Sequence, residues 1–178
     1  MATTRSRSLR SLAEPTQTEV PAVRSAAFEP AVAPLYSGLV RRLVVVLGDA
    51  DEAQDVAQDA YLQAFRAWER FDGSDGRAWL YTIALRIAFN QLRRRRRWFA
   101  AVRRIDPKPW RDSVDPDLWA ALGDLDPQMR SVLMLNVVDG YTQTEIAEML
   151  SVPVGTVSSW ISRSRVRLRE ALTPREEA

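Results

Sequence analysis

The chain has 178 residues, with 25 basic and 23 acidic side chains, a formal net charge of +2, and neither cysteine nor histidine. The missing residue types exclude disulfide bonds, thiolate or imidazole catalysis, and metal sites built from cysteine or histidine. No paired-carboxylate or glycine-rich phosphate motif stands out either, so we expect neither an enzyme nor a bound cofactor or metal.

Residues 1–30 are rich in Ser, Thr, Ala, Pro and Arg and show no helical or strand period. This composition predicts a flexible tail. The tail contains arginines but no apolar core of the kind that export signals need. The longest aliphatic run, Leu43–Leu47, is far too short to span a bilayer. We therefore expect a cytoplasmic protein without membrane insertion.

Two helices are predicted after this tail. Apolar residues recur at helical spacing from about 33 to 47, and Gly48 ends this first helix. Asp49 or Asp51 caps a second helix, which carries an apolar stripe at intervals of three and four residues. From Asp49 to Asp59 the chain holds five acids and no base, so the outer face of the second helix is acidic.

The third predicted helix is basic. Residues 71–76 form a turn-rich loop, and Asp75 caps a long helix that runs into the five arginines at 93–97. Between Arg77 and Arg111 there are eleven bases and one acid. Of the 25 basic residues 24 are arginine, whose planar fork suits phosphate and guanine contacts. The nucleotide composition of the source genome is the better explanation for scattered arginines. The concentration of basic residues in one segment is stronger evidence of a binding role.

The middle of the chain changes character. Residues 98–114 lack a regular period and contain prolines on both sides of Lys108, which predicts an extended basic linker. Asp115 and Asp126 each stand directly before a proline, and each caps the start of a further helix. Gly140 closes the second of these helices.

Residues 141–165 are predicted to form two short helices joined by a tight turn. Thr142 caps the first through its hydroxyl while Glu145 reaches back in a capping box. The turn at 151–153 contains a proline, which stops the first helix and suits the start of the second. The outer face of the second helix is small and polar enough to enter a groove. This is the layout of a helix-turn-helix DNA reader.

No segment alternates like a strand, so we predict an all-α fold of two small helical domains. The first domain spans residues 31–97 and contains three to four helices. The second spans residues 115–173 and is a four-helix unit that includes the helix-turn-helix. The basic linker at 98–114 joins the two, and residues 174–178 form an acidic tail.

Three blocks carry a resemblance to a known family: residues 51–68, residues 78–84 with the arginine run that follows, and residues 140–165. In this order the chain resembles bacterial RNA polymerase sigma factors of the extracytoplasmic-function (ECF) type, within the sigma-70 family. The resemblance implies a factor that binds core RNA polymerase and promoter DNA and directs promoter-specific initiation. It places region 2 in the first domain and region 4 in the second, and it suggests an anti-sigma protein as a further partner.

The resemblance implies that the acidic helix docks on the clamp helices of the polymerase β′ subunit. Spacings of three and four residues put Glu52, Asp55 and Asp59 on one exposed face, which suits a basic partner. The alternative is a solvated face whose acids interact with the helix dipole. Because the neighbouring blocks match as well, we favour docking. The implied polymerase-binding residues are Asp51, Glu52, Asp55, Gln58 and Asp59.

The loop at 71–76 and the third helix correspond to the part of region 2 that captures and melts the minus-10 promoter element. Separated strands need a basic path for phosphates and stacking surfaces for flipped bases. We expect Trp79 to lie in the core, which leaves Tyr81 as the exposed ring. Arg86 and Asn90 stand where members commonly carry asparagine and aspartate, so the melting role is implied but the base preference is not. The implied minus-10 residues are Arg77, Tyr81, Arg86, Asn90, Arg93 and Arg94.

In the family, region 4 inserts its second helix into the major groove of the minus-35 element, and its other surface holds the polymerase β flap. Gly155 permits close approach of the backbone to DNA. Ser158 and Trp160 stand where members often have basic residues, so contacts early in the helix are weaker or more apolar here. For Trp160 we expect packing against the preceding helix. The implied minus-35 residues are Gly155, Thr156, Ser158, Ser159, Arg163 and Arg165.

Two other functions are compatible with parts of the sequence. A transcription factor of the response-regulator kind would use only the C-terminal unit, leaves residues 51–97 unexplained, and lacks its phosphoacceptor domain here. A helical partner-binding protein whose arginine run contacts RNA or an acidic protein leaves the helix-turn-helix without a role. The sigma-factor interpretation is the one that uses all three blocks.

Overall fold

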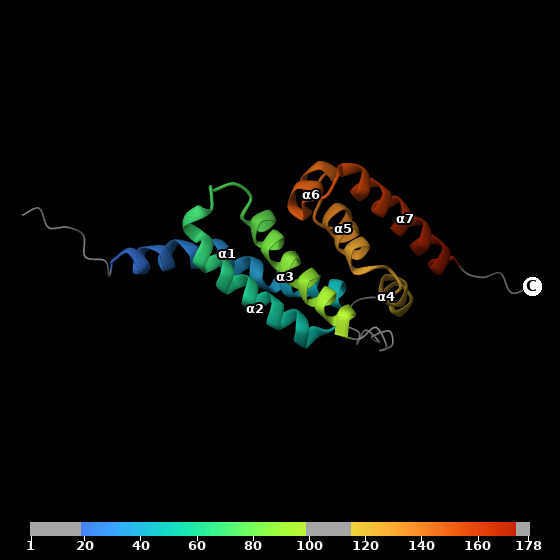
Figure 1. The fold of residues 1–178 in the computed structure, drawn as a ribbon, viewed down its shortest axis with the longest axis horizontal. Helices are drawn as coiled ribbons and strands as arrows, with labels where there is room; N and C mark the ends of the chain where they lie inside the picture. Colours follow the sequence, from blue (N-terminus) through green and yellow to red (C-terminus); the bar gives the residue numbers. More distant parts are fainter. Residues whose placement is uncertain (1–18, 99–114, 174–178) are drawn as a thin grey trace, which may run out of the picture.

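The computed structural model describes residues 19–98 and 115–173, and within these ranges it contains helices and no strand (Figure 1). The predicted all-α fold is therefore confirmed. The predictions for residues 1–18, for the linker after residue 98 and for the tail at 174–178 lie outside the described residues. The elements are α1 (Glu19–Leu47), α2 (Ala50–Ala67), a single 3-10 turn (Trp68–Arg70), α3 (Gly76–Trp98), α4 (Pro116–Gly123), α5 (Pro127–Val137), α6 (Gln143–Leu150) and α7 (Val154–Leu172).

Helix α1 begins well before the predicted start near residue 33, so the prediction of a flexible tail is wrong for residues 19–30. Pro30 and Pro34 lie inside the helix, where proline removes a hydrogen bond and crowds the preceding turn. Packing offsets this cost. Phe28 is only 1% exposed, and its ring meets those of Tyr61 and Phe65 edge to face at centroid distances of 4.9 and 5.3 Å.

The first three helices form the N-terminal unit. Asp49 caps α2 by accepting hydrogen bonds from the backbone N–H groups of Asp51 and Glu52, at 3.0 and 2.9 Å. The buried face of α2 consists of Ala53, Val56, Ala57, Ala60 and Ala64, and these small side chains let α1 and α3 approach closely. The opposite, outer face of α2 is thereby left to charged residues.

Helices α4–α7 form the C-terminal unit, and their ends agree with the predicted caps. Asp115 and Asp126 accept hydrogen bonds from the backbone N–H groups two residues later, at 2.9 and 3.0 Å. Thr142 and Glu145 form the predicted capping box at the start of α6. Ser151 takes a left-handed conformation, with φ of 54°, in the turn that leads into α7.

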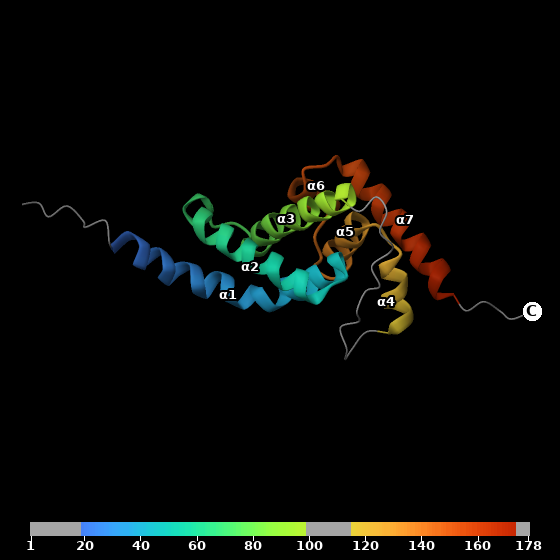
Figure 2. The ribbon, with the colours of Figure 1, turned by 60° about the horizontal axis from the view of Figure 1, so that its bottom comes forward.

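The two units pack against each other. Helix α5 lies against α1 and α6 lies against α3, as the view in Figure 2 also shows. One continuous group of buried apolar side chains runs through both units, from Leu43 of α1 to Val132 of α5 and Ile146 of α6. The stretch Ala26–Leu47 is long and apolar enough, by length and composition alone, to cross a bilayer. Part of this stretch is buried in that core, namely Phe28, Val32, Leu39, Val40, Leu43, Val44, Val46 and Leu47.

Candidate nucleic-acid and polymerase interfaces

The acidic face of α2 is on the surface. Asp51, Asp55, Gln58 and Asp59 are exposed, and for Asp55 and Asp59 this agrees with the prediction from their spacing. Glu52 is different, because it is half-buried and both of its carboxylate oxygens accept hydrogen bonds from Arg95 of α3, at 2.7 and 2.8 Å. Its charge is therefore matched within the molecule, and the acidic face is carried by the aspartates.

An apolar groove lies beside these acids, between α1 and α2. It is lined by Ala33, Tyr36, Gln58, Tyr61 and Leu62, and Leu62 is 52% exposed. An exposed leucine and two tyrosines next to a row of carboxylates provide both an apolar centre and a charged rim. Protein–protein interfaces have this composition. The groove was not predicted from the sequence, because it forms between two helices. A helical period in the sequence does not predict where two helices cross.

Helix α3 presents a basic row to solvent. Arg86, Asn90, Arg93 and Arg94 are exposed at intervals of three and four residues, so they share one side of the helix. The amide oxygen of Asn90 accepts a hydrogen bond from the guanidinium of Arg93. The arginines present planar donors suited to a phosphate backbone. At the other end of the helix Arg77 is also exposed, next to the capping residue Asp75.

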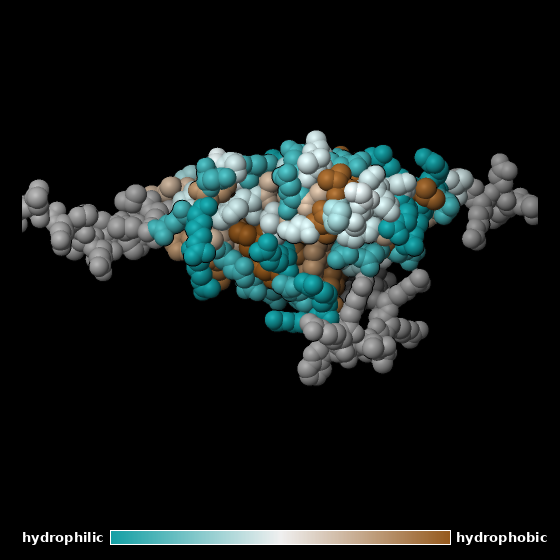
Figure 3. Space-filling view, turned by 45° about the horizontal axis from the view of Figure 1, so that its top comes forward, coloured by the Kyte–Doolittle hydropathy of each residue, from teal (hydrophilic) through white to brown (hydrophobic). Residues whose placement is uncertain are grey.

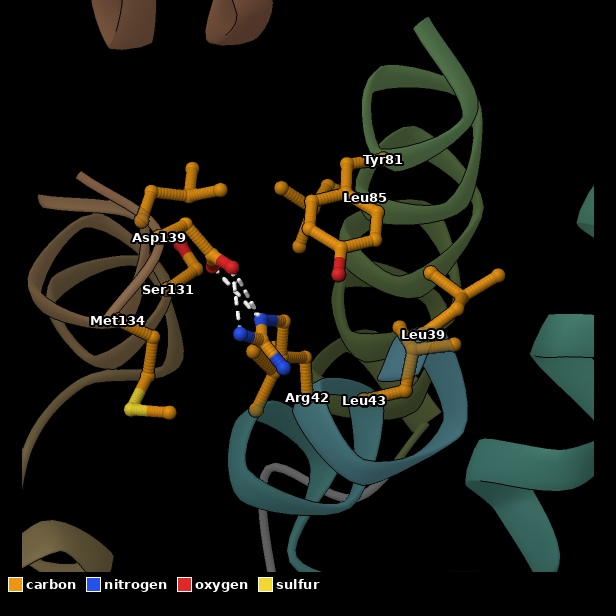
Figure 4. Close-up of a pocket in the computed structure, with 10 residues that line it drawn as sticks. Leu39, Arg42, Leu43, Tyr81, Leu85, Ser131, Met134 and Asp139 are labelled. Carbon is orange, nitrogen blue, oxygen red and sulfur yellow. Dashed lines mark hydrogen bonds and ion pairs between the residues drawn. The ribbon is translucent and has the colours of Figure 1, made fainter. Parts of the chain in front are cut away.

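The prediction that Tyr81 is an exposed ring is wrong. Tyr81 is 5% exposed and lines a small cavity between the two units, with the guanidinium carbon of Arg42 5.8 Å from its ring centroid (Figure 4). Burial is the main reason why its pKa is raised. The period of α3 could not reveal this burial, because part of the cover comes from α5, which is distant in the sequence.

Two partly exposed rings lie at the loop before α3. Trp79 is half-buried rather than fully in the core, and its ring lies 4.9 Å from that of Phe71, which is stacked on Trp68 at 5.1 Å. Phe71 is the aromatic residue that the sequence analysis missed. Its position at the start of a glycine-containing loop, three residues after Trp68, was the available signal in the sequence.

Helix α7 has one buried side and one exposed side. Its buried side carries Val157 and Ile161, which fix it against the rest of the unit. Trp160 is half-buried and packs against both apolar clusters, whereas its predicted contact with the preceding helix stays a prediction. Where α6 and α7 lie, the surface in Figure 3 is pale and teal with isolated hydrophobic patches. The exposed predicted residues are Gly155, Ser158, Ser159, Arg163 and Arg165, and Thr156 is half-buried.

The arginines of α7 are partly oriented by neighbours. The Nε of Arg163 donates to the backbone oxygen of Ser159, at 3.3 Å, and an Nη of Arg165 donates to the side-chain oxygen of Asn136 in α5, also at 3.3 Å. Both guanidinium groups are exposed. An ideal Cβ on Gly155 would meet nothing within 4 Å, so the backbone there is open to an approaching ligand.

An acidic helix, a basic helix and an exposed helix-turn-helix on one all-helical chain define a protein that binds both another protein and DNA. Comparisons with known proteins agree with this class. The family description "Sigma-70 region 2" matches residues 31–98, and "Sigma-70, region 4" matches residues 116–168. The chain belongs to the ECF group of sigma-70 family RNA polymerase sigma factors, which direct promoter-specific transcription initiation by RNA polymerase.

Individual relatives support this assignment. The chain is 32% identical to the ECF RNA polymerase sigma factor SigE of Mycolicibacterium smegmatis, over 89% of this chain and 68% of that protein. It is 34% identical to the RNA polymerase sigma-H factor of Pseudomonas aeruginosa, over 77% and 80% of the two chains.

Among solved structures, the chain resembles the sigma factor RpoE of Bartonella quintana, crystallised with the anti-sigma factor NepR. That likeness has a TM-score of 0.71 and 26% identity, over 84% of this chain and 99% of the other. It also resembles CnrH in complex with the cytosolic domain of CnrY, with a TM-score of 0.61 and 27% identity, over 87% and 93% of the chains.

Proposed function

We propose a division of labour among three surfaces of this sigma factor. The aspartates of α2 and the apolar groove beside them bind the β′ clamp helices of core polymerase. The basic row of α3 and the loop before it capture and melt the minus-10 element. Helix α7 reads the minus-35 element, and the remaining surface of that unit holds the β flap. The observation that carries this proposal is that all three surfaces are exposed on one chain.

The chemistry of each surface supports its role. Carboxylates around an apolar groove steer a basic partner and then bury apolar area against it. Arginines spaced along one side of α3 give single strands a path for their phosphates, and the rings of Phe71 and Trp79 offer stacking surfaces. Because Arg86 and Asn90 stand where members of the family commonly carry asparagine and aspartate, the minus-10 preference of the family is not carried over to this factor.

The proposal extends to catalysis, location and control. The factor contributes no catalytic residue of its own, since polymerase carries out the chemistry, and it works in the cytoplasm where polymerase is found. Two structural neighbours were solved in complex with a partner, which in one case is an anti-sigma factor. We therefore include an anti-sigma protein among the partners of this chain.

Run-off transcription on a genomic promoter library tests the function as a whole. Core polymerase with the purified factor is expected to give specific transcripts that core polymerase alone does not give. If an active core enzyme gives no specific transcript with the factor, the proposed function is wrong. Because arginine–phosphate contacts release counterions, promoter affinity is also expected to fall steeply with salt.

Charge reversal tests the division of labour. Asp55→Lys and Asp59→Lys are expected to weaken polymerase binding several-fold each, because they place a cation opposite a basic partner. Glu170→Lys, a reversal on the exposed last turn of α7, is the matched control and should leave polymerase binding unchanged. Arg163→Ala should also leave polymerase binding unchanged and reduce use of promoters that depend on the minus-35 element. Equal losses of polymerase binding in all four variants would contradict separate surfaces.

A further inference from the structure

The first turns of α1 lie outside the part of the chain that matches sigma-70 region 2. The helix begins twelve residues before that match does. Pro30 and Pro34 disfavour a continuous helix here, so these turns need support from other parts of the fold. Among residues 26–30 only Phe28 is buried, with 1% of its surface exposed. Within this stretch Phe28 is therefore the side chain that anchors α1 to the rest of the unit.

The ring of Phe28 contacts three aromatic side chains at and just after the end of α2. It meets Tyr61, Phe65 and Trp68 edge to face, at centroid distances of 4.9, 5.3 and 5.3 Å. All three distances lie in the range of favourable aromatic pairs. The contact with Trp68 leads towards the proposed DNA surface, because Trp68 begins the 3-10 turn that precedes the loop before α3.

Trp68 belongs to a cluster of three half-buried rings at this loop. It is stacked on Phe71 at 5.1 Å, Phe71 lies 4.9 Å from Trp79, and the two tryptophans meet edge to face at 5.9 Å. If Phe71 were sandwiched between the tryptophans, their centroids would be about 10 Å apart, the sum of the other two distances. The tryptophans therefore do not enclose the Phe71 ring, which leaves it able to stack on an unpaired base.

The backbone of the loop is held by short-range hydrogen bonds. The N–H of Phe71 donates to the carbonyl oxygen of Trp68 at 3.1 Å, and the N–H of Ser74 donates to the carboxylate of Asp72 at 3.0 Å. These bonds set the path of the backbone but not the direction of the Phe71 ring. That direction depends on packing against Trp68, which packs in turn on Phe28.

We propose that Phe28 is a positioning residue for strand capture. It holds the ring of Trp68, and through it the ring of Phe71, in the orientation that receives an unpaired base of the minus-10 element. This proposal rests on the proposed function, which assigns strand capture to the loop before α3. Phe28 itself touches no DNA, because it is buried. A ring that is oriented before DNA arrives loses less conformational entropy on binding, so the support from Phe28 increases affinity.

Phe28 also contacts Tyr61, which lines the groove that we propose for polymerase. Tyr61 has a second aromatic neighbour, Tyr36, at a centroid distance of 6.0 Å, so the groove keeps support without Phe28. An effect on strand capture still has to be separated from an effect on polymerase binding. The holoenzyme is therefore assembled with enough factor to saturate core polymerase.

Phe28→Leu tests the proposal, because leucine keeps an apolar side chain in the core but has no ring edge. Phe28→Met is a second variant of the same kind. The matched control is Val44→Ala, which removes buried carbon from the same helix about four turns further on, where the side chain is also 1% exposed. Urea unfolding of all three variants shows how much stability each has lost.

The probe is a fluorescein-labelled single strand that carries the minus-10 element of a promoter which the factor uses in run-off transcription. Both Phe28 variants should weaken its binding to holoenzyme about fivefold, which corresponds to one lost aromatic contact. Val44→Ala should leave strand binding unchanged. Unchanged binding in both Phe28 variants, or an equal loss in Val44→Ala, would overturn the positioning role.

Phe71→Ala distinguishes a failure of this proposal from a failure of the proposed function. The substitution should weaken strand binding, because it removes a stacking surface. If Phe28 acts through Phe71, adding Phe28→Leu to Phe71→Ala causes no further loss. A further fivefold loss in the double variant contradicts the proposal. If Phe71→Ala alone has no effect, the stacking role in the proposed function is wrong.

Near-UV circular dichroism of the free factor tests the positioning without polymerase or DNA. Tryptophan bands in this region require fixed packing around the rings. Phe28→Leu should reduce these bands, because Trp68 and Trp79 lose part of their fixed surroundings, and Val44→Ala should leave them unchanged. The far-UV spectra of both variants should match that of the unsubstituted factor. Unchanged near-UV bands in Phe28→Leu would show that Phe28 does not order the rings, whatever the strand-binding result.

Discussion

The placement of the groove-reading helix depends on one fully buried valine, which gives a sharp quantitative test. Val157 of α7 is 0% exposed and packs in the core of the C-terminal unit. Val166 lies on the same helix and is 46% exposed. The substitutions Val157→Ala and Val166→Ala therefore remove the same atoms from the same helix in two different environments.

The expected free energies follow from burial. Removing two buried carbon groups at Val157 costs about 1.6 kcal/mol of burial. The cavity left behind adds about 1 kcal/mol, and the better helix propensity of alanine returns about 0.5 kcal/mol. The net loss at Val157 is about 2 kcal/mol. At Val166 about half of the burial term is lost and no cavity forms, so the same gain in propensity leaves a loss of about 0.3 kcal/mol.

Urea unfolding followed by far-UV circular dichroism measures both losses, and binding to a duplex carrying the minus-35 element measures their consequence. Val157→Ala should shift the unfolding transition and weaken duplex binding, because α7 is then held less firmly. Val166→Ala should do neither. Similar losses of stability in the two variants would refute the view that Val157 anchors α7.

Two further predictions concern local polar contacts. Thr142→Ala removes the capping box of α6 and should cost about 1 kcal/mol, whereas Thr144→Ala, on the exposed face of the same helix, should cost nothing; urea unfolding compares them. The hydroxyl of Tyr141 donates to Oδ2 of Asp75 at 2.9 Å, and this contact between the two units should make stability depend on pH. Burial acts to raise the pKa of Asp75, but hydrogen bonds from Ala78, Tyr141 and Arg77 outweigh it and lower that pKa below 3.8. The stability contributed by Asp75 is therefore present above pH 3.8 and is lost as the pH falls through the lowered value. Burial and the bond to Asp75 raise the pKa of Tyr141 above 10, so its contribution is present below pH 10 and is lost as the pH rises through the raised value. Urea unfolding should show lower stability at both extremes of pH, and Tyr141→Phe should remove the alkaline change.

Features that depend on a few consecutive residues were predictable from the sequence. The caps at Asp49, Asp75, Asp115, Asp126 and Thr142 all have the predicted hydrogen bonds, because a side chain meets backbone groups two or three residues away. The buried stripe of α2 also follows from periodicity alone. The helix starts marked by these caps were therefore accessible without knowledge of the tertiary fold, whereas the start of α1, at Glu19, was not.

Features that depend on distant partners were not predictable. Pro30 and Pro34 disfavour a helix in the early part of α1. The packing that offsets their cost comes from Tyr61 and Phe65, which lie on another helix. Tyr81 is buried because α1 and α5 both cover it, and a helical period states only which side of α3 it lies on. The same holds for the hydrogen bonds between the two units, Arg42–Asp139, Arg130–Val45 and Tyr141–Asp75, each of which joins residues at least 66 positions apart.

The segregation of charge along the sequence has a structural meaning that only the fold supplies. Glu52 lies in the first turn of α2 and Arg95 lies in the last turns of α3, and the two meet in an ion pair. An acid at a helix N-terminus and a base at a helix C-terminus each interact favourably with the helix dipole, so this pair joins two already favourable ends. Reversing the charge of residue Glu52 would therefore disturb α3 and the proposed DNA surface together with α2. Asp55 and Asp59 have exposed carboxylates away from that junction, which is why they, and not Glu52, isolate the contribution of the acidic face to polymerase binding.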